Sequence, residues 1–279
     1  MIRRVGKNLG LLDGADATTA PDASRQLEAE GWALLPGLFN PAEVAELTAE
    51  VEAVYAAVEP DVRFREGDRP DFRYEMYNRS PAVQRAIGHP RILSVIEPLL
   101  GDDCHVIANT AWRNPPDFPG GPWHCDAGPH VPRPADVAWD DRIPYPLFVI
   151  GAHLWLRDVT VADGPTAVIP GSHRSGQLPP RHRRHDPLLD YHGRTAVAPD
   201  ASAGDVLLFA SDSWHRGTPS SPQGSGRLFV QCHYGRRDIA QRVLTTDLVN
   251  QVGPQARARI GSEREAELLG LHQPFFYDG

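Results

Sequence analysis

Apolar residues change their spacing along the chain, from a helical period near the N-terminus to short separate runs after residue 104. Five of them recur at helical spacing: Val44, Leu47, Val51, Val54 and Val58. Asn40 and Pro41 supply a capping side chain and a first-turn proline, so this helix begins there. Helices are also predicted at 24–30 and 90–100, each closed by glycine, with a short strand at 32–35. The charged, aromatic stretch 60–80 shows no period and predicts a surface loop.

From Cys104 onward, short apolar runs alternate with clusters of Gly, Pro, Asp and Ser. The runs cover 104–113, 121–126, 147–157, 165–169, 204–210 and 227–234. Many short strands with such punctuation favour an antiparallel sandwich or barrel. Helices followed by strands indicate a single α+β domain. The tail then predicts two more helices, near 238–250 and 254–268, with Ser262 and Glu265 placed for a capping box.

Residues 1–23 predict a loose leader, so the domain is expected to span 24–279. Within it, the segment 127–146 carries five prolines: Pro129, Pro132, Pro134, Pro144 and Pro146. Long segments without their own periodicity are often lids or binding loops. We expect a lid here, and a rigid proline-rich excursion is the alternative.

Composition narrows the classes of function. The chain has 279 residues and a net charge of −8, which disfavours bulk attraction to nucleic acid or anionic membranes. Lys7 is the sole lysine, which disfavours Schiff-base catalysis and a Walker-type phosphate loop because both need a lysine. Three scattered cysteines without a Cys-x-x-Cys pair fit a reducing interior. No run of 18 apolar residues occurs. We therefore expect a cytoplasmic protein.

His124 and Asp126 form the most informative pair. If Trp123-His124-Cys125-Asp126 is extended, alternation places the imidazole and the carboxylate on one face. His215 would complete two histidines and one carboxylate, a set that suits non-haem Fe(II) oxygenases because it leaves open positions on the metal. A chain with 12 histidines contains about one His-x-Asp by chance. The interpretation of this motif therefore depends on its context in the rest of the sequence.

That context includes an arginine. Gly204 and Asp205 precede a buried strand that ends shortly before His215, and Arg227 begins the next strand. Alternation puts four side chains on one face of that strand: Arg227, Phe229, Gln231 and His233. We read His233 as a core histidine. We expect His215 and Arg227 at corresponding ends of neighbouring strands, where the arginine could hold a dicarboxylate whose other end chelates the metal.

Together these motifs resemble the phytanoyl-CoA dioxygenase family of Fe(II)/2-oxoglutarate oxygenases. The matching pieces are His124-Cys125-Asp126, the segment from Asp163 to His173 that ends Pro-Gly-Ser-His, the Gly204-Asp205 strand with His215, and Arg227. The likeness runs over about residues 24–235. It implies a double-stranded β-helix (jelly-roll, cupin-like) core with flanking helices at both ends. It also implies Fe(II), 2-oxoglutarate and O2 as cofactors.

The resemblance assigns roles to single residues. It makes His124, Asp126 and His215 the iron ligands and lets Arg227 bind the distal carboxylate of 2-oxoglutarate. It places Thr218 where relatives often carry a small hydroxyl residue near that carboxylate.

Five further residues are candidates by position. Asn109 lies on the strand before the ligand motif, where relatives often place a polar cosubstrate contact. On the strand at 147–157, His153 and Trp155 share a face, and the choice of a cosubstrate contact between them stays open. His130, in the expected lid, and Trp123 are candidate substrate contacts.

Because Asp126 is present, the resemblance favours hydroxylation over halogenation. The implied reaction oxidises a small molecule, which we expect to be a secondary metabolite, and releases succinate and CO2. Two alternatives remain: a cupin-like metal enzyme that does not use 2-oxoglutarate, and a non-catalytic jelly-roll binding protein. The response of 2-oxoglutarate affinity to loss of Arg227 discriminates between the first alternative and the main interpretation.

Overall fold

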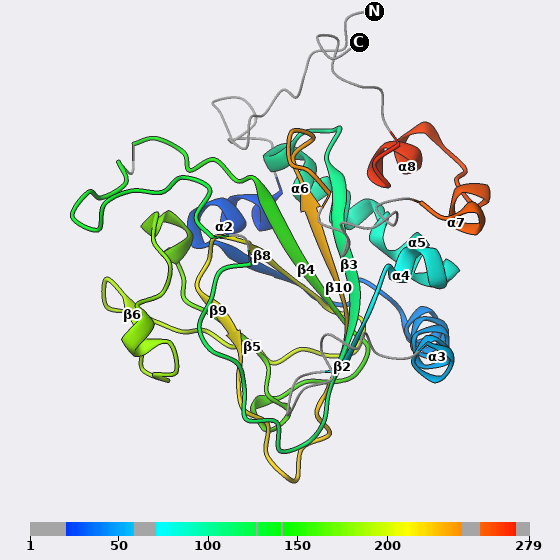
Figure 1. The fold of residues 1–279 in the computed structure, drawn as a ribbon, viewed down its shortest axis with the longest axis horizontal. Coiled ribbons are helices and arrows are strands. Elements are labelled where there is room, and N and C mark those ends of the chain that lie inside the picture. Colours follow the sequence, from blue (N-terminus) through cyan, green and yellow to red (C-terminus); the bar gives the residue numbers. More distant parts are fainter. Residues whose placement is uncertain (1–20, 59–70, 127, 141, 242–251, 272–279) are drawn as a thin grey trace, which may run out of the picture.

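The computed structural model describes residues 21–58, 71–126, 128–140, 142–241 and 252–271. Most of the leader expected at 1–23 and of the helix expected at 238–250 lies outside these ranges. Within them, helices pack on one side of a large antiparallel sheet and a smaller strand pair faces the other side (Figure 1). No helix in the described ranges combines the length and apolar character needed to cross a membrane.

The N-terminal elements follow the predicted pattern. Helix α2 (Asp22–Glu30) ends at Gly31, whose φ of 79° is left-handed, and β1 (Trp32–Leu35) follows. Helix α3 (Pro41–Ala57) begins with a complete capping box, because Asn40 accepts from the Glu43 amide and Glu43 accepts from the Asn40 amide. The other α-helices of the described ranges are α4 (Met76–Arg79), α5 (Pro81–Ile87), α6 (Pro90–Leu100), α7 (Pro254–Ala258) and α8 (Glu263–Leu268).

The large sheet has the strand order β1-β8-β4-β10-β3-β2, and all neighbours are antiparallel. Its other strands are β2 (Asp71–Tyr74), β3 (His105–Asn114), β4 (Val149–Trp155), β8 (Val206–Ala210) and β10 (Arg227–Gly235). A separate pair joins β5 (Thr166–Val168) to β9 (His215–Gly217), and a third small sheet joins β6 (Asp190–Tyr191) to β7 (Arg194–Thr195). Short 3-10 helices η2 (Val161–Asp163), η3 (Ser172–Ser175) and η4 (Arg181–Arg183) lie in the connections.

Strand β10 shows how the sheet separates core from cavity. Its even-numbered residues Leu228, Val230 and Cys232 join the hydrophobic core beneath the helices. Its odd-numbered residues face the opposite side, as the alternation predicts, and line a cavity between the large sheet and the β5–β9 pair. The large sheet therefore forms one wall of the cavity, and the odd-numbered side chains of β10 project from it into the cavity.

Several local predictions need correction. The expected loop at 60–80 contains β2 and α4 in its described part, because Phe72 pairs with Trp112 at the sheet edge. The run at 121–126 is no regular strand and makes one bridge, between His124 and His215. The helix expected at 254–268 is two helices, α7 and α8. The Ser262 side chain caps α8, yet Glu265 accepts from Gly261 instead of closing a capping box.

Candidate active site

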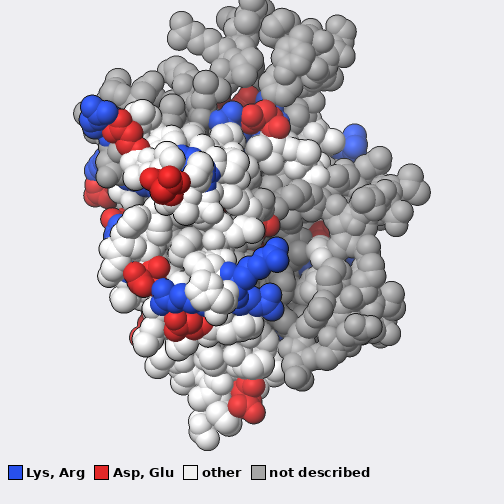
Figure 2. Space-filling view, turned by 60° about the vertical axis from the view of Figure 1, so that its left-hand side comes forward, with Lys and Arg blue, Asp and Glu red and all other residues white. Residues whose placement is uncertain are grey.

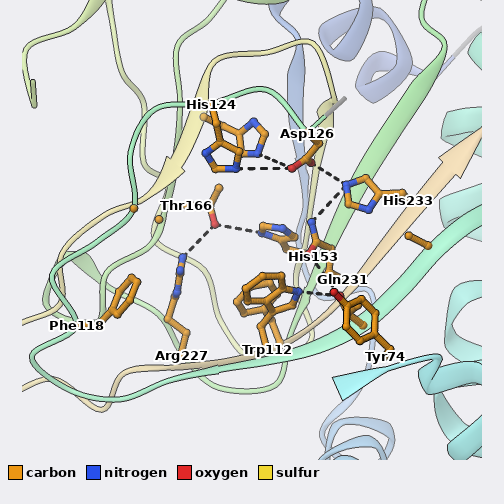
Figure 3. A pocket seen from close by; sticks show the side chains of 16 residues that line it. Tyr74, Trp112, Phe118, His124, Asp126, His153, Thr166, Arg227, Gln231 and His233 are labelled. Atoms are coloured by element: carbon orange, nitrogen blue, oxygen red, sulfur yellow. Dashed lines mark hydrogen bonds and ion pairs between the residues drawn. The ribbon is translucent and has the colours of Figure 1, made fainter. Parts of the chain in front are cut away.

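Three side chains from two segments that are far apart in the sequence converge above the large sheet. His124 and Asp126 come from the segment bridged to β9, and His215 opens β9 itself. One ligand atom from each lies within 4.8 Å of the others (Figure 3). Asp126 Oδ1 is 3.7 Å from His124 Nε2 and 3.4 Å from His215 Nε2. Two imidazole nitrogens and a carboxylate oxygen are thus gathered into a set that fits a divalent metal.

Backbone hydrogen bonds fix the histidine rings for this task. His124 Nδ1 lies 2.9 Å from the Pro122 carbonyl oxygen, and His215 Nδ1 lies 2.9 Å from the Ser213 carbonyl oxygen. Since a carbonyl only accepts, each Nδ1 carries the hydrogen and donates it. Each Nε2 is then the ring atom that can offer a lone pair to a metal when the ring is neutral.

The electrostatics of the cluster keep Asp126 ionised. Burial opposes its charge, but His215 and His233 outweigh burial through their charge and hydrogen bonds and hold the pKa of Asp126 well below its usual range. Burial and the neighbouring His215 lower the pKa of His124, although Asp126 opposes them. Against the effect of burial, Asp126 in turn raises the pKa of His215. A metal would therefore bind by displacing a proton from that ring while Asp126 is already ionised.

Arg227 provides a buried positive charge at the other end of the cavity. It is 5% exposed, and Nη1 donates to Thr166 Oγ1 at 3.3 Å. Among the described residues no carboxylate forms an ion pair with it, and its Nε has no hydrogen-bond partner. Burial lowers its pKa from 12.5 to about 10. An unpaired guanidinium in a cavity wall is a site for a carboxylate.

Thr166 links Arg227 to His153. The hydroxyl oxygen of Thr166 lies 3.1 Å from His153 Nδ1, and the same oxygen accepts from Arg227. Thr166 stands directly opposite Gly217 in the β5–β9 pair. A Cβ atom at Gly217 would collide with the Arg227 guanidinium. The absence of a side chain there allows the arginine of the large sheet to reach the smaller one.

The relation between His215 and Arg227 differs from the predicted one. They are not on neighbouring strands of one sheet, because β9 pairs with β5, whereas β10 pairs with β3 and β4. The two side chains approach from facing sheets across the cavity that both line.

The cosubstrate candidates separate clearly in the structure. His153 lines the cavity, whereas Trp155 packs behind Phe229 in a small hydrophobic cluster. The Thr218 hydroxyl donates to the Pro165 carbonyl at 2.8 Å, so Thr166 supplies the hydroxyl beside Arg227 instead. These positions favour His153 and Thr166 over Trp155 and Thr218.

Asn109 points away from the cavity, which corrects its predicted role. Its amide nitrogen donates to the Gln231 carbonyl at 2.9 Å, and its amide oxygen accepts from the Tyr77 amide at 2.8 Å. Alternation along β3 sends the even-numbered Thr110 and Trp112 into the cavity. Asn109 is therefore occupied in joining α4 to the sheet.

The two candidate substrate contacts do not line the cavity. His130 directs its ring at Asp212 and stacks on Phe148 with 5.0 Å between ring centroids. Trp123 is buried, and its indole nitrogen donates to the Asp186 carbonyl at 2.8 Å. Both residues brace the segments on either side of the ligand motif.

The cavity has a volume of about 340 Å³, within the range of small-molecule sites. Beyond the residues already placed, Tyr74, Thr110, Trp112, Gln231 and His233 line it. Strand alternation identifies Gln231 and His233 from the sequence. His233, which we read as a core histidine, contacts Asp126 instead. Thr166 lies inside the Asp163–His173 motif, but nothing in the motif indicates its partner.

The surface near η4 carries mixed charge. Arg183 donates to Asp186 at 2.9 Å and lies 3.4 Å from Asp190. Figure 2 shows acidic and basic side chains interspersed on this side of the molecule. Partial neutralisation of the basic run at 181–185 fits a solvated surface.

The comparisons with known sequences agree with this geometry. The model of the family described as phytanoyl-CoA dioxygenase (PhyH) matches residues 27–227. An ectoine dioxygenase from Bordetella parapertussis is 30% identical over 244 residues, which are 77% of this chain and 75% of that protein. An L-proline trans-4-hydroxylase from Streptomyces griseoviridis is 26% identical over 205 residues, covering 66% of this chain and 68% of the other.

Solved structures resemble the whole fold. EctD from S. alaskensis, solved with 2-oxoglutarate and 5-hydroxyectoine, gives a TM-score of 0.64 at 23% identity and covers 96% of this chain and 92% of its own. HygX from Streptomyces hygroscopicus, solved with nickel, 2-oxoglutarate and hygromycin B, gives 0.63 at 19% identity, with coverage of 80% and 89%. These similarities confirm the predicted jelly-roll core with flanking helices.

Proposed function

This chain belongs to the phytanoyl-CoA dioxygenase family, and we propose that His124, Asp126 and His215 hold the ferrous ion of an Fe(II)/2-oxoglutarate-dependent hydroxylase. The convergence of these three ligands beside the unpaired Arg227 is the observation that carries the proposal. Family membership confirms the predicted dioxygenase class and its cofactors, iron, 2-oxoglutarate and O2.

Arg227 is proposed to bind the distal carboxylate of 2-oxoglutarate. The guanidinium is buried, has no acidic partner among the described residues and already donates to Thr166. A carboxylate there would restore the charge balance that burial disturbs. Thr166 and His153 complete the polar end of the site, and Phe229 contributes an apolar wall below the guanidinium.

Iron with bound 2-oxoglutarate would supply the oxidising chemistry, with succinate and CO2 as the expected by-products. The residues of this chain supply the geometry. His124 and His215 present their Nε2 lone pairs, and Asp126 stays ionised. We propose hydroxylation over halogenation because the carboxylate occupies a metal position that a halide would need.

We propose that the substrate is a small molecule with uncharged polar groups, such as a secondary metabolite. Thr110 and Gln231 place a hydroxyl and an amide on the cavity floor, 3.5 Å apart, and Trp112 donates to Thr110 at 2.7 Å. Tyr74 and Trp112 add aromatic walls. A cavity of about 340 Å³ that must also hold 2-oxoglutarate leaves room for a compact substrate.

Anaerobic titration tests the metal and cosubstrate together. The protein with Fe(II) and 2-oxoglutarate should develop a weak charge-transfer absorption, and a panel of metabolites should include one that stimulates succinate release. Absence of that absorption at saturating Fe(II) and 2-oxoglutarate would leave a non-catalytic jelly-roll protein as the better description.

The variant Arg227→Met tests the cosubstrate assignment. Loss of the two-pronged charge should weaken 2-oxoglutarate binding by 100-fold or more, on the order of 3 kcal/mol. Because burial of the unpaired guanidinium lowers its pKa from 12.5 to about 10, the variant without cosubstrate should unfold at an equal or higher temperature than the wild type. Calorimetric binding and thermal melts measure both effects.

Arg113→Met is the matched control, since Arg113 lies on β3 and pairs with Glu52 at 3.2 Å outside the cavity. It should leave 2-oxoglutarate affinity unchanged. Unaltered affinity in Arg227→Met would point to a cupin-like metal enzyme that does not use this cosubstrate.

A further inference from the structure

His233 contacts the proposed metal carboxylate from behind. Its Nε2 lies 2.7 Å from Asp126 Oδ2, and its side chain is 10% exposed (Figure 3). A carboxylate that is ionised can only accept, so His233 carries its hydrogen on Nε2 and donates it. This is the opposite tautomer from that of His124 and His215, whose Nδ1 atoms donate to backbone carbonyls.

The two oxygens of Asp126 consequently have different partners. Oδ1 faces the Nε2 atoms of His124 and His215, at 3.7 and 3.4 Å. Oδ2 faces His233. A carboxylate with one oxygen held by a donor cannot turn about its χ2 axis without losing a charge-assisted hydrogen bond.

The sheet is built to bring His233 to this position. On its two neighbouring strands, His233 is paired with Ala108 of β3 and Gly151 of β4. Both partners are small, so the imidazole has room on the cavity face. The Gln231 amide nitrogen, two residues earlier on β10, lies 3.3 Å from the same Nε2 atom. Because an amide nitrogen can only donate, it is a neighbour of the ring and does not take the Nε2 hydrogen from Asp126.

We propose that His233 is a positioning residue that fixes the orientation of Asp126, so that Oδ1 is the oxygen presented to the metal. The inference rests on the proposed function. It explains why a histidine stands inside the cavity yet outside the group of three ligands.

Removal of a group that orients a metal ligand typically lowers metal affinity or activity by about 10- to 100-fold. Two variants separate the hydrogen bond from the shape of the ring. His233→Phe keeps a planar ring without a donor, and His233→Gln keeps an N–H near the position of Nε2. Fe(II) binding without substrate, measured by anaerobic equilibrium dialysis, reports on the metal alone. The charge-transfer absorption of the Fe(II) and 2-oxoglutarate complex reports on the ligand arrangement.

We expect His233→Phe to weaken Fe(II) binding by at least about 10-fold and to shift or broaden the absorption. His233→Gln should stay within about threefold of the wild type, because the donor is retained. The control His105→Gln replaces another buried histidine, whose Nε2 lies 2.7 Å from the Ile239 carbonyl oxygen and which does not line the cavity. It should leave both readouts unchanged.

Wild-type affinity and absorption in His233→Phe would overturn the inference while leaving the proposed function intact. Failure of the wild-type protein to show the absorption would instead overturn the proposed function. If His233→Phe does not fold, as judged by circular dichroism, His233→Asn takes its place. Its amide is one methylene shorter than that of glutamine and should not reach Asp126, so it should show the same loss. Equal Fe(II) binding by the Asn and Gln variants would then contradict the inference.

Discussion

At the scale of single residues, Thr166 decides how the anion end of the cavity is arranged. The residue is 2% exposed, and its hydroxyl stands between the Arg227 guanidinium and His153. Burial lowers the pKa of His153 well below its usual range, and the positive Arg227 lowers it further, so the ring is neutral. The Thr166 hydroxyl therefore contacts both the cationic Arg227 and the neutral His153 ring, and it orients both side chains.

Thr166→Val should raise the KM for 2-oxoglutarate by about 5- to 30-fold, the loss expected when one hydrogen bond to a charged group is removed from a buried site. The substitution preserves the branched shape, so the melting temperature should change little. Thr218→Val is the matched control, because the Thr218 hydroxyl donates to the Pro165 carbonyl and not to Arg227. Steady-state kinetics with 2-oxoglutarate as the varied component measure the difference. Equal effects in both variants would remove Thr166 from the cosubstrate site.

At the scale of elements, the proline-rich segment 127–146 is fastened at several points. In its described part, His130 and Tyr145 both bond to the buried Asp212, and the Arg133 amide donates to the Gly176 carbonyl at 3.1 Å. Asp212 lies in the turn between β8 and β9, three residues before His215. The segment is thus tied to the element that carries a proposed metal ligand. Its role as a lid stays a prediction.

Asp212→Asn should loosen this segment without unfolding the domain. The variant keeps the shape but removes the charge that His130 and the Tyr145 hydroxyl contact. We expect amide hydrogen exchange in the described parts of 128–146 to accelerate by about 10-fold or more, on the order of 1.4 kcal/mol of local stability. Asp140→Asn is the control within the same segment, because Asp140 pairs with the exposed Arg142. Unchanged exchange in Asp212→Asn would show that Asp212 does not hold the segment in place.

At the scale of the whole molecule, a buried histidine makes stability depend on pH. His173 of η3 is fully buried, and its Nε2 donates to the Glu28 carbonyl of α2 at 3.0 Å. Burial, with a contribution from Arg174, lowers its pKa from 6.5 to about 3. The unfolded chain therefore takes up a proton at a pH where the folded protein does not. This histidine costs nothing above pH 6.5 and destabilises the fold progressively as the pH falls from 6.5 towards 3.

His173→Gln should flatten that dependence while keeping a donor for the Glu28 carbonyl. One such group contributes up to about 1.4 kcal/mol per pH unit, so the wild type should lose roughly 2 kcal/mol more than the variant between pH 6.5 and 5. Urea denaturation at both pH values gives the two differences in the free energy of unfolding. Equal losses in wild type and variant would mean that other groups govern acid unfolding.

Structural features that depend only on residues close together in the chain could be predicted from the sequence. The capped helix α3, the alternation along β10 and the glycine after α2 follow from spacing and residue type. His124 and Asp126 share a short segment, and alternation alone predicts that Arg227, Phe229, Gln231 and His233 face one way. Family membership follows from motifs that are themselves local.

Contacts between side chains from distant segments could not be predicted from the sequence and are seen in the tertiary structure. Thr166 and not Thr218 reaches Arg227, Asn109 turns from the cavity, and His233 contacts Asp126. These outcomes depend on which strands pair and in what register, and a shift of one residue turns a side chain to the opposite face. Strand β9 lies in a different sheet from β10 although few residues separate them. Spacing along the chain does not predict how far apart β9 and β10 lie in space, because that distance depends on how the two sheets pack.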